Sequence, residues 1–119
     1  MTQKYHQLTQ DINRNLATLR SGIPEVIQGF GAMAKAANSE GALDTKTKEL
    51  IALALGVAMR CDPCIGFHTK ALVDLGVTEA EIQEMLGVAI YMGGGPSMMY
   101  AANAMAAFNE FSEAKTANS

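Results

Sequence analysis

The order of apolar and polar residues along the chain predicts an all-helical protein, with no segment that alternates as a strand would. Near the N-terminus, apolar residues recur every three or four positions, which is the spacing of one helix face. We therefore predict a first helix from about residue 4 to residue 20. Its apolar stripe consists of Leu8, Ile12, Leu16 and Leu19. Pro24 suits the first turn of a second helix, which gives way to a loop at residues 38–41.

Two further helices are predicted on either side of the only two cysteines in the chain. Asp44 is a good N-cap for a helix that runs to about residue 60. Within it, residues 50–59 are apolar on every side, so we expect this helix to be buried all round, in the domain core or between subunits. Because the residue before a proline avoids helical backbone angles, we expect Asp62 to cap the next helix and Pro63 to begin it.

Glycine and capping residues mark the remaining boundaries. Gly76 suits the end of the fourth helix. Thr78 and Glu81 have the spacing of a capping box, which predicts a fifth helix to about residue 92. Pro96 begins a sixth helix that runs to about residue 114. The sequence thus predicts a single all-α domain over residues 1–119, with about six helices.

The composition narrows the possible functions. Apolar residues make up 49% of the 119-residue chain and charged residues only 18%, below the ~25% typical of soluble domains. A small helical protein with so few charges is expected to bury apolar surface in a partner, and we predict a homo-oligomer. The net charge is −3 with no basic stripe, which argues against nucleic-acid binding.

We expect a soluble, cytoplasmic protein. Residues 1–20 are polar and of mixed charge, unlike a signal peptide. The longest apolar run, residues 50–59, is about half of what spans a bilayer, so no membrane association is predicted. In a reducing cytosol, two cysteines three residues apart indicate redox chemistry or metal binding rather than a structural disulfide.

The candidate chemistry lies in the segment Cys61-Asp62-Pro63-Cys64 and in His68. A helix N-terminus offers unpaired N–H groups and a partial positive charge, both of which favour thiolate over thiol. With Pro63 as the first helical residue, Cys64 lies in the first turn, and Cys61 lies just outside it as the more exposed thiol. His68 follows Cys64 by four residues on the same helix face, so it can accept the Cys64 proton or pair with the thiolate.

Other interpretations of these residues stay open. The cysteines could be two buried core residues, or a redox-sensing or scaffold module could use the pair only to lock the helix end. The two cysteines and His68 could also bind zinc, with Glu49 as a fourth ligand. Spacing alone favours Glu49 as a solvated residue in the first turns of its helix. The break at Asp62-Pro63 nevertheless allows an antiparallel hairpin that would bring Glu49 toward His68.

Several segments together form a recognisable pattern. A glutamate at residue 49 is followed by eleven residues, Cys-x-x-Cys at 61–64, three residues and the histidine at 68. The flanking residues contribute as well: Leu43-Asp44, Lys46 to Leu53, Cys61 to Ile65 and Tyr91 to Pro96. Over about residues 24 to 110, the chain resembles the alkylhydroperoxidase D-like proteins of the carboxymuconolactone decarboxylase superfamily.

This resemblance implies an all-α fold around a central antiparallel helix pair that carries the Cys-x-x-Cys motif, and assembly into trimers or hexamers. It also implies an antioxidant enzyme that reduces peroxides with thiols. The reductant would be an external dithiol, a lipoyl group or a thioredoxin-like protein, and no cofactor or metal is expected. A proton relay around a dithiol that cycles to a disulfide is implied for four catalytic residues: Glu49, Cys61, Cys64 and His68.

Two comparisons with that family refine the expectation. The best-studied members have a second histidine between the cysteines, where this chain has Asp62-Pro63, so the relay would be shorter here. Members that decarboxylate lactones lack the cysteine pair. The presence of the pair in this chain therefore argues against lactone decarboxylation.

Overall fold

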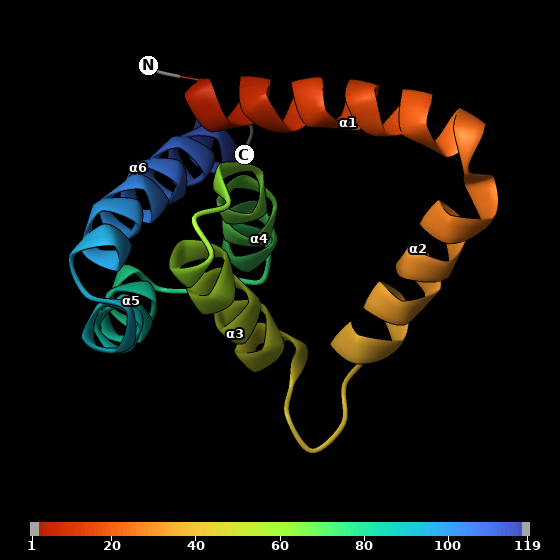
Figure 1. Ribbon diagram of the computed structural model, residues 1–119. Coiled ribbons are helices and arrows are strands. Elements are labelled where there is room, and N and C mark those ends of the chain that lie inside the picture. Colours follow the sequence, from red (N-terminus) through yellow and green to blue (C-terminus); the bar gives the residue numbers. More distant parts are fainter. Residues whose placement is uncertain (1–2, 118–119) are drawn as a thin grey trace.

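The computed structural model describes residues 3–117, which form six helices joined by short connections (Figure 1). In chain order they are α1 (Lys4–Gly22), α2 (Pro24–Asn38), α3 (Thr45–Ala58), α4 (Asp62–Asp74), α5 (Glu79–Gly93) and α6 (Gly95–Ala117). The predicted all-α class is confirmed. No helix in this part of the chain is both long and apolar enough to cross a membrane.

A hairpin of α3 and α4 lies at the centre of the fold. It packs against α5 and α6, and the first turns of α1 lie across α4 (Figure 1). The core between these helices contains several completely buried side chains: Leu53, Val57, Ile65, Leu72 and Ile82. Burying one such side chain contributes about 1.5–3 kcal/mol, so this cluster holds the hairpin and its neighbours together. The predicted central helix pair is therefore confirmed.

The boundaries of α3 and α5 follow from capping residues that the sequence already indicated. The Asp44 carboxylate accepts a hydrogen bond from the Thr47 amide at 2.7 Å. The Thr78 hydroxyl accepts from the Glu81 amide at 3.1 Å, and the Glu81 carboxylate accepts from the Thr78 amide at 2.9 Å. Each hydrogen bond satisfies an amide that the helix itself leaves unpaired.

The expectation that α3 is buried all round holds on one face only. Leu53 and Val57 are completely buried, whereas Ile51, Leu55 and Met59 are about half exposed or more in the single chain. The exposed residues recur every four positions and so form one apolar stripe on the helix. A face of this kind is typical of an interface with another protein chain.

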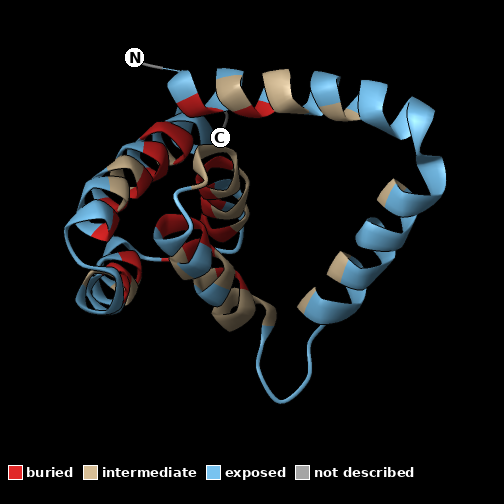
Figure 2. Ribbon diagram, viewed as in Figure 1, coloured by how far each residue is buried: buried red, intermediate tan, exposed pale blue. Residues whose placement is uncertain are grey.

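The α1–α2 segment extends away from the rest of the fold (Figure 2). The apolar stripe predicted for α1 lies closer to the C-terminal end of the helix than the residues that are buried. Leu19 of the stripe is exposed, whereas the buried residues of α1 are Tyr5 and Thr9. The reason is that α1 meets α4 only at its first turns, where Gly66 lets the two helices approach. A Cβ at Gly66 would lie 2.7 Å from Thr9 Cγ2. No residue of α2 is buried.

A glutamate on the last helix caps the first one. The Gln3 side chain makes no capping hydrogen bond at the start of α1. Instead, the Glu110 carboxylate on α6 accepts hydrogen bonds from the amides of Tyr5 at 2.9 Å and His6 at 2.8 Å. Glu110 is only 6% exposed, so these hydrogen bonds offset the cost of burying its charge. The contact fixes the start of α1 against the core.

Replacing Glu110 with glutamine is therefore expected to destabilise the protein by about 2 kcal/mol, because the buried amides lose a charged acceptor. Urea unfolding followed by circular dichroism would measure this as a lower midpoint at unchanged slope. Glu113→Gln is the matched control, since Glu113 is an exposed glutamate on the same helix. Equal stability of Glu110→Gln and the control would contradict the capping role.

Candidate active site

The turn between α3 and α4 is built by hydrogen bonds that reverse the chain. The Arg60 amide donates to the Val57 carbonyl at 3.2 Å, and the Cys61 amide donates to the Gly56 carbonyl at 2.9 Å. This is the pattern of a Schellman motif, in which the residue after the helix takes a left-handed conformation. That residue is Arg60, with φ of 59°. The motif ends α3 and places Cys61 at the start of α4.

Cys61 caps α4, and this differs from the sequence prediction. Its Sγ accepts a hydrogen bond from the Cys64 amide at 3.2 Å. The prediction that Asp62 would be the cap is wrong by one residue, because the Asp62 carboxylate is engaged by side chains from other helices. Cys64 lies in the first turn of α4, as predicted, but the amide that points at the Cys61 sulfur brings Cys61 into the field of the helix end too.

Cys61 and Cys64 form a disulfide with their Cα atoms 5.2 Å apart, and both residues are half-buried. The expected difference in exposure between them is therefore not found. Gly56 on α3 lies directly against this pair. A Cβ at Gly56 would be 3.2 Å from the Cys64 Cβ, closer than side chains normally pack. The absence of a side chain at this position lets α3 come close to the turn that carries the disulfide.

Glu49 and His68 form a pair across the α3–α4 hairpin. Glu49 Oε2 lies 2.7 Å from His68 Nδ1, and Glu49 is only 8% exposed. Spacing alone favoured a solvated Glu49, and the structure contradicts that interpretation. The hairpin formed by the break at residues 59–61 brings together side chains 19 positions apart in sequence. Because a carboxylate only accepts, a hydrogen on Nδ1 makes this contact, and in the neutral imidazole Nε2 is then the nitrogen that can accept a proton.

The disulfide and His68 line one pocket. It has a volume of about 370 Å³, and its remaining walls come from α3: Ala52, Leu55, Gly56 and Met59. Sequence-predicted residues Cys61, Cys64 and His68 are thus brought together at one surface, and Glu49 reaches that surface through His68. An apolar pocket with a few polar groups at one end is typical of a site for a small organic molecule.

A second polar network lies at the same turn, and sequence reasoning did not find it. The Tyr5 hydroxyl donates to Asp62 Oδ1 at 3.1 Å, and Asn103 Nδ2 lies 3.4 Å from the same oxygen. Burial and the neighbouring Asp62 carboxylate raise the pKa of Tyr5 well above its usual range, so the phenol stays protonated and donates. The three residues lie on α1, α4 and α6, and no local sequence pattern links them.

The zinc site that the sequence left open does not form among residues 3–117 of the structure. In that range, no group of three or more His, Cys, Asp or Glu side chains is arranged to hold a metal ion. Glu49, which would have been the fourth ligand of a zinc site, is hydrogen-bonded to His68 instead.

Comparisons with known proteins agree with this architecture. The model of the carboxymuconolactone decarboxylase family matches residues 24–107. A solved structure of a member of that family from Legionella pneumophila, in its apo form, superposes with a TM-score of 0.91 at 55% identity, covering 93% of this chain and 99% of the other. A member from Thermotoga maritima, described as having a suggested part in the antioxidative response, gives a TM-score of 0.83 at 29% identity, covering 92% and 94%. An uncharacterized protein of Cupriavidus necator is 38% identical over 109 residues, which is 92% of this chain and 96% of that one.

Proposed function

The chain belongs to the carboxymuconolactone decarboxylase family, and on that premise we propose that it is a thiol-dependent peroxidase, a disulfide oxidoreductase that uses the Cys61–Cys64 pair. The observation that carries this proposal is the Glu49–His68 hydrogen bond beside the dithiol pocket. It supplies a base of fixed orientation next to a cysteine pair that can cycle between dithiol and disulfide. The description of the Thermotoga maritima relative supports an antioxidant role.

In the proposed reaction, His68 accepts the Cys64 proton through Nε2 while Glu49 holds Nδ1. The Cys64 thiolate attacks the outer oxygen of a hydroperoxide. The O–O bond breaks, the alkoxide takes up a proton and leaves as an alcohol, and the sulfur becomes a sulfenic acid. The Cys61 thiol then attacks that sulfur, and the hydroxyl leaves with a proton as water. In sum, one hydroperoxide and two thiols give an alcohol, water and the disulfide.

An external dithiol closes the proposed cycle. One of its thiolates attacks the disulfide, and its second thiol resolves the mixed disulfide, so that the external dithiol is oxidised and Cys61 and Cys64 are reduced. The Cys64 amide that points at the Cys61 sulfur stabilises this sulfur as a leaving thiolate. A lipoyl group or a thioredoxin-like protein has the required chemistry, and a slender lipoyl arm suits the size of the pocket.

The proposal is tested by counting thiols. The reduced protein is mixed with an organic hydroperoxide, and free thiols are counted by mass after alkylation. We expect each chain to lose two free thiols. In the Cys64→Ser variant we expect no disulfide within the chain to form. Unchanged thiols in excess peroxide would refute peroxidase activity. A reduction potential far below the cytosolic poise would favour instead a pair that only locks the helix end, as in a redox-sensing or scaffold module.

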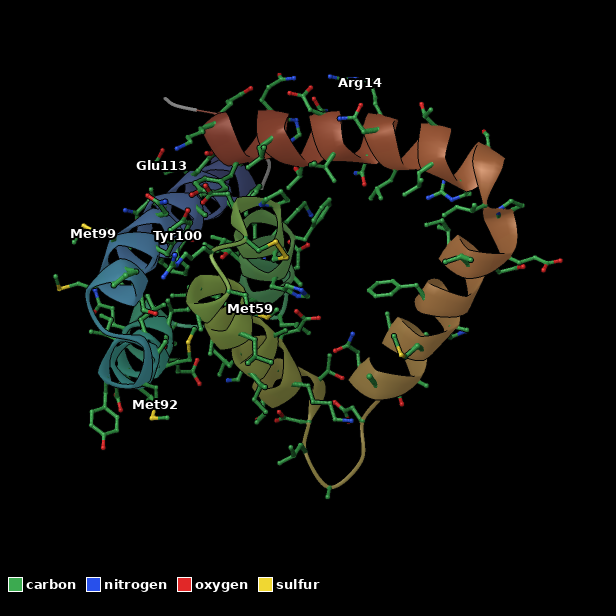
Figure 3. The ribbon with its side chains drawn as sticks, in the orientation of Figure 1. Arg14, Met59, Met92, Met99, Tyr100 and Glu113 are labelled. Carbon is green, nitrogen blue, oxygen red and sulfur yellow. A yellow bond between two sulfur atoms is a disulfide. The ribbon has the colours of Figure 1, made fainter. Side chains whose placement is uncertain are left out.

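We also propose that the protein is a homo-oligomer, a trimer or a hexamer. Its accessible surface is 7451 Å², whereas a compact monomer of 12.6 kDa has about 6,200 Å². Its radius of gyration is 14.7 Å, against about 13.5 Å for a compact chain of this length. Large apolar side chains are exposed on α2, α5 and α6. Figure 3 shows two of them, Met92 on α5 and Met99 on α6, extending outward. The excess surface is comparable to that which one partner buries in a standard interface.

This assembly predicts a mass of three or six chains in size-exclusion chromatography with light scattering. Phe30 on α2 is 65% exposed although it is large and apolar. Phe30→Asp is expected to shift the protein toward smaller species, because a charge buried in an interface is costly. Lys35→Asp on the same helix is the charge-changing control. A monomer at micromolar concentration for the unmodified chain would contradict the proposal.

A further inference from the structure

Asp62 is the charged residue enclosed by the disulfide ring. It lies between Cys61 and Cys64 as the first residue of α4, and its carboxylate does not cap the helix. Instead, Oδ1 accepts from the Tyr5 hydroxyl at 3.1 Å and lies 3.4 Å from Asn103 Nδ2. Both partners are uncharged. The salt bridges of Arg14, Lys46 and Lys70 go to other carboxylates. The negative charge of Asp62 therefore belongs to a residue inside the ring that the disulfide closes, and its hydrogen bonds there go to uncharged groups.

The Tyr5 donor is itself fixed in place. Tyr5 is only 1% exposed, and its amide donates to the Glu110 carboxylate. Its carbonyl accepts from the Thr9 hydroxyl at 3.0 Å, and Gly66 leaves room for its ring against α4. Because these contacts fix the Tyr5 side chain, its hydroxyl cannot follow the Asp62 carboxylate if that carboxylate moves. The position of Asp62 is thus imposed by α1 and α6 rather than by the redox-active turn itself.

Other charged and titratable groups around the dithiol are paired or already engaged. From α3, Glu49 is bound to His68, and from α6, Glu110 is occupied by two amides. From α1, Tyr5 is a neutral donor, and Lys4 is engaged with the Tyr5 ring, with its Nζ 5.5 Å from the ring centroid. Arg60 precedes Cys61 in the chain and is exposed to solvent, which screens its charge. Asp62 is accordingly the carboxylate that lies between the two cysteines in the chain, and its hydrogen bonds go to uncharged partners.

We propose that Asp62 tunes the Cys61–Cys64 pair toward the disulfide, and that Tyr5 and Asn103 are positioning residues for its carboxylate. This inference rests on the proposed function, since it describes the same dithiol cycle. A fixed negative charge disfavours a thiolate beside it and so destabilises the reduced protein above the thiol pKa. When the reduced protein exchanges with the disulfide form of an external dithiol, the two protein thiols are oxidised and the external disulfide is reduced. Asp62 thus makes the reduced protein a stronger reductant than it would be with a neutral residue at this position.

The test uses Asp62→Asn, which removes the charge and keeps an oxygen that can accept from Tyr5 and Asn103. Redox equilibration of the full-length protein against glutathione is followed from pH 6 to pH 9 by mass after alkylation. We expect the equilibrium constant for reduction to rise roughly fivefold at pH 9 and to change less at pH 6, where a smaller share of the thiols is ionised. Asp74→Asn, at the other end of α4 and paired with Lys70, is the matched control and should leave both values unchanged.

A double-mutant cycle assigns the role of Tyr5. Tyr5→Phe removes only the hydroxyl, which frees the carboxylate to approach the sulfurs, so we expect the constant at pH 9 to fall. In the Asp62→Asn background the same change should have no effect. If the unmodified pair cannot be cycled by glutathione at all, the proposed function fails. If the pair cycles normally and Asp62→Asn matches the unmodified protein across the pH range, only this inference is overturned.

Discussion

Replacing His68 with glutamine is expected to slow the oxidation of the dithiol by an organic hydroperoxide by about 10²- to 10⁴-fold, the range typical of a lost general base. The Glu49 contact holds Nδ1 and leaves Nε2 at the pocket that also contains both sulfurs. Glutamine keeps polarity and approximate size but cannot accept a proton at neutral pH. Rapid-quench alkylation with thiol counting by mass measures the rate directly.

The control for this prediction is built into the chain. His6 is the only other histidine, and it lies exposed at the start of α1. His6→Gln should leave the rate unchanged. Glu49→Gln should cost less than His68→Gln, and combining the two should add little to the His68 effect, because Glu49 acts through His68. Full activity of His68→Gln would remove the relay from the mechanism, although the dithiol chemistry could remain.

Replacing Gly56 with valine is expected to destabilise the protein by about 3 kcal/mol, the upper range for overpacked sites. The ideal Cβ position already lies 3.2 Å from the Cys64 Cβ and 3.7 Å from the Ile65 amide nitrogen. The two additional methyl groups of valine would meet the backbone of α4, which cannot move without disturbing the disulfide. We therefore expect slower dithiol oxidation as well as a lower urea midpoint.

Gly87→Ala provides the comparison for Gly56. Gly87 lies within a helix too, but nothing stands within 4 Å of its Cβ position. Alanine there should stabilise the protein by up to about 1 kcal/mol through helix propensity. Opposite signs at the two positions would show that the cost at Gly56 comes from the close approach of α3 to Cys64. Equal stability of the two variants would exclude that explanation.

The sequence was most informative where structure is determined locally. The capping box at Thr78 and Glu81 predicted the start of α5 because both partners lie within one turn. The sequence predicted a break at Asp62-Pro63 that allows a hairpin. In the structure the turn lies at residues 59–61, and the hairpin places Glu49 against His68. Spacing within the chain could not show that Glu49 is buried, since burial depends on how α3 packs against its neighbours.

The features that sequence reasoning missed depend on contacts between distant residues. Asp62 is a plausible N-cap by local rules, but the Tyr5 hydroxyl, 57 positions away, competes for its carboxylate. Cys61 then supplies the cap instead. For α1, periodicity identified a real apolar stripe but not which part of it meets the core, because that choice depends on the absence of a side chain at Gly66. Local patterns carry no information about these partners.

The cap that Glu110 places on α1 also bears on how the chain reaches its structure during synthesis. The amide of Tyr5 and the carboxylate that it binds are separated by 105 positions in the sequence. At about 5–20 residues per second, the ribosome needs on the order of 5–20 seconds to cover that distance. Until then the first turn of α1 lacks its acceptors, and most of the stability of a helix in a protein comes from packing against the rest of the fold. The cap on α1 therefore waits for α6, although the packing of α1 against α4 can begin earlier. Assembly that needs a fixed α1–α2 segment is delayed until α6 has been made.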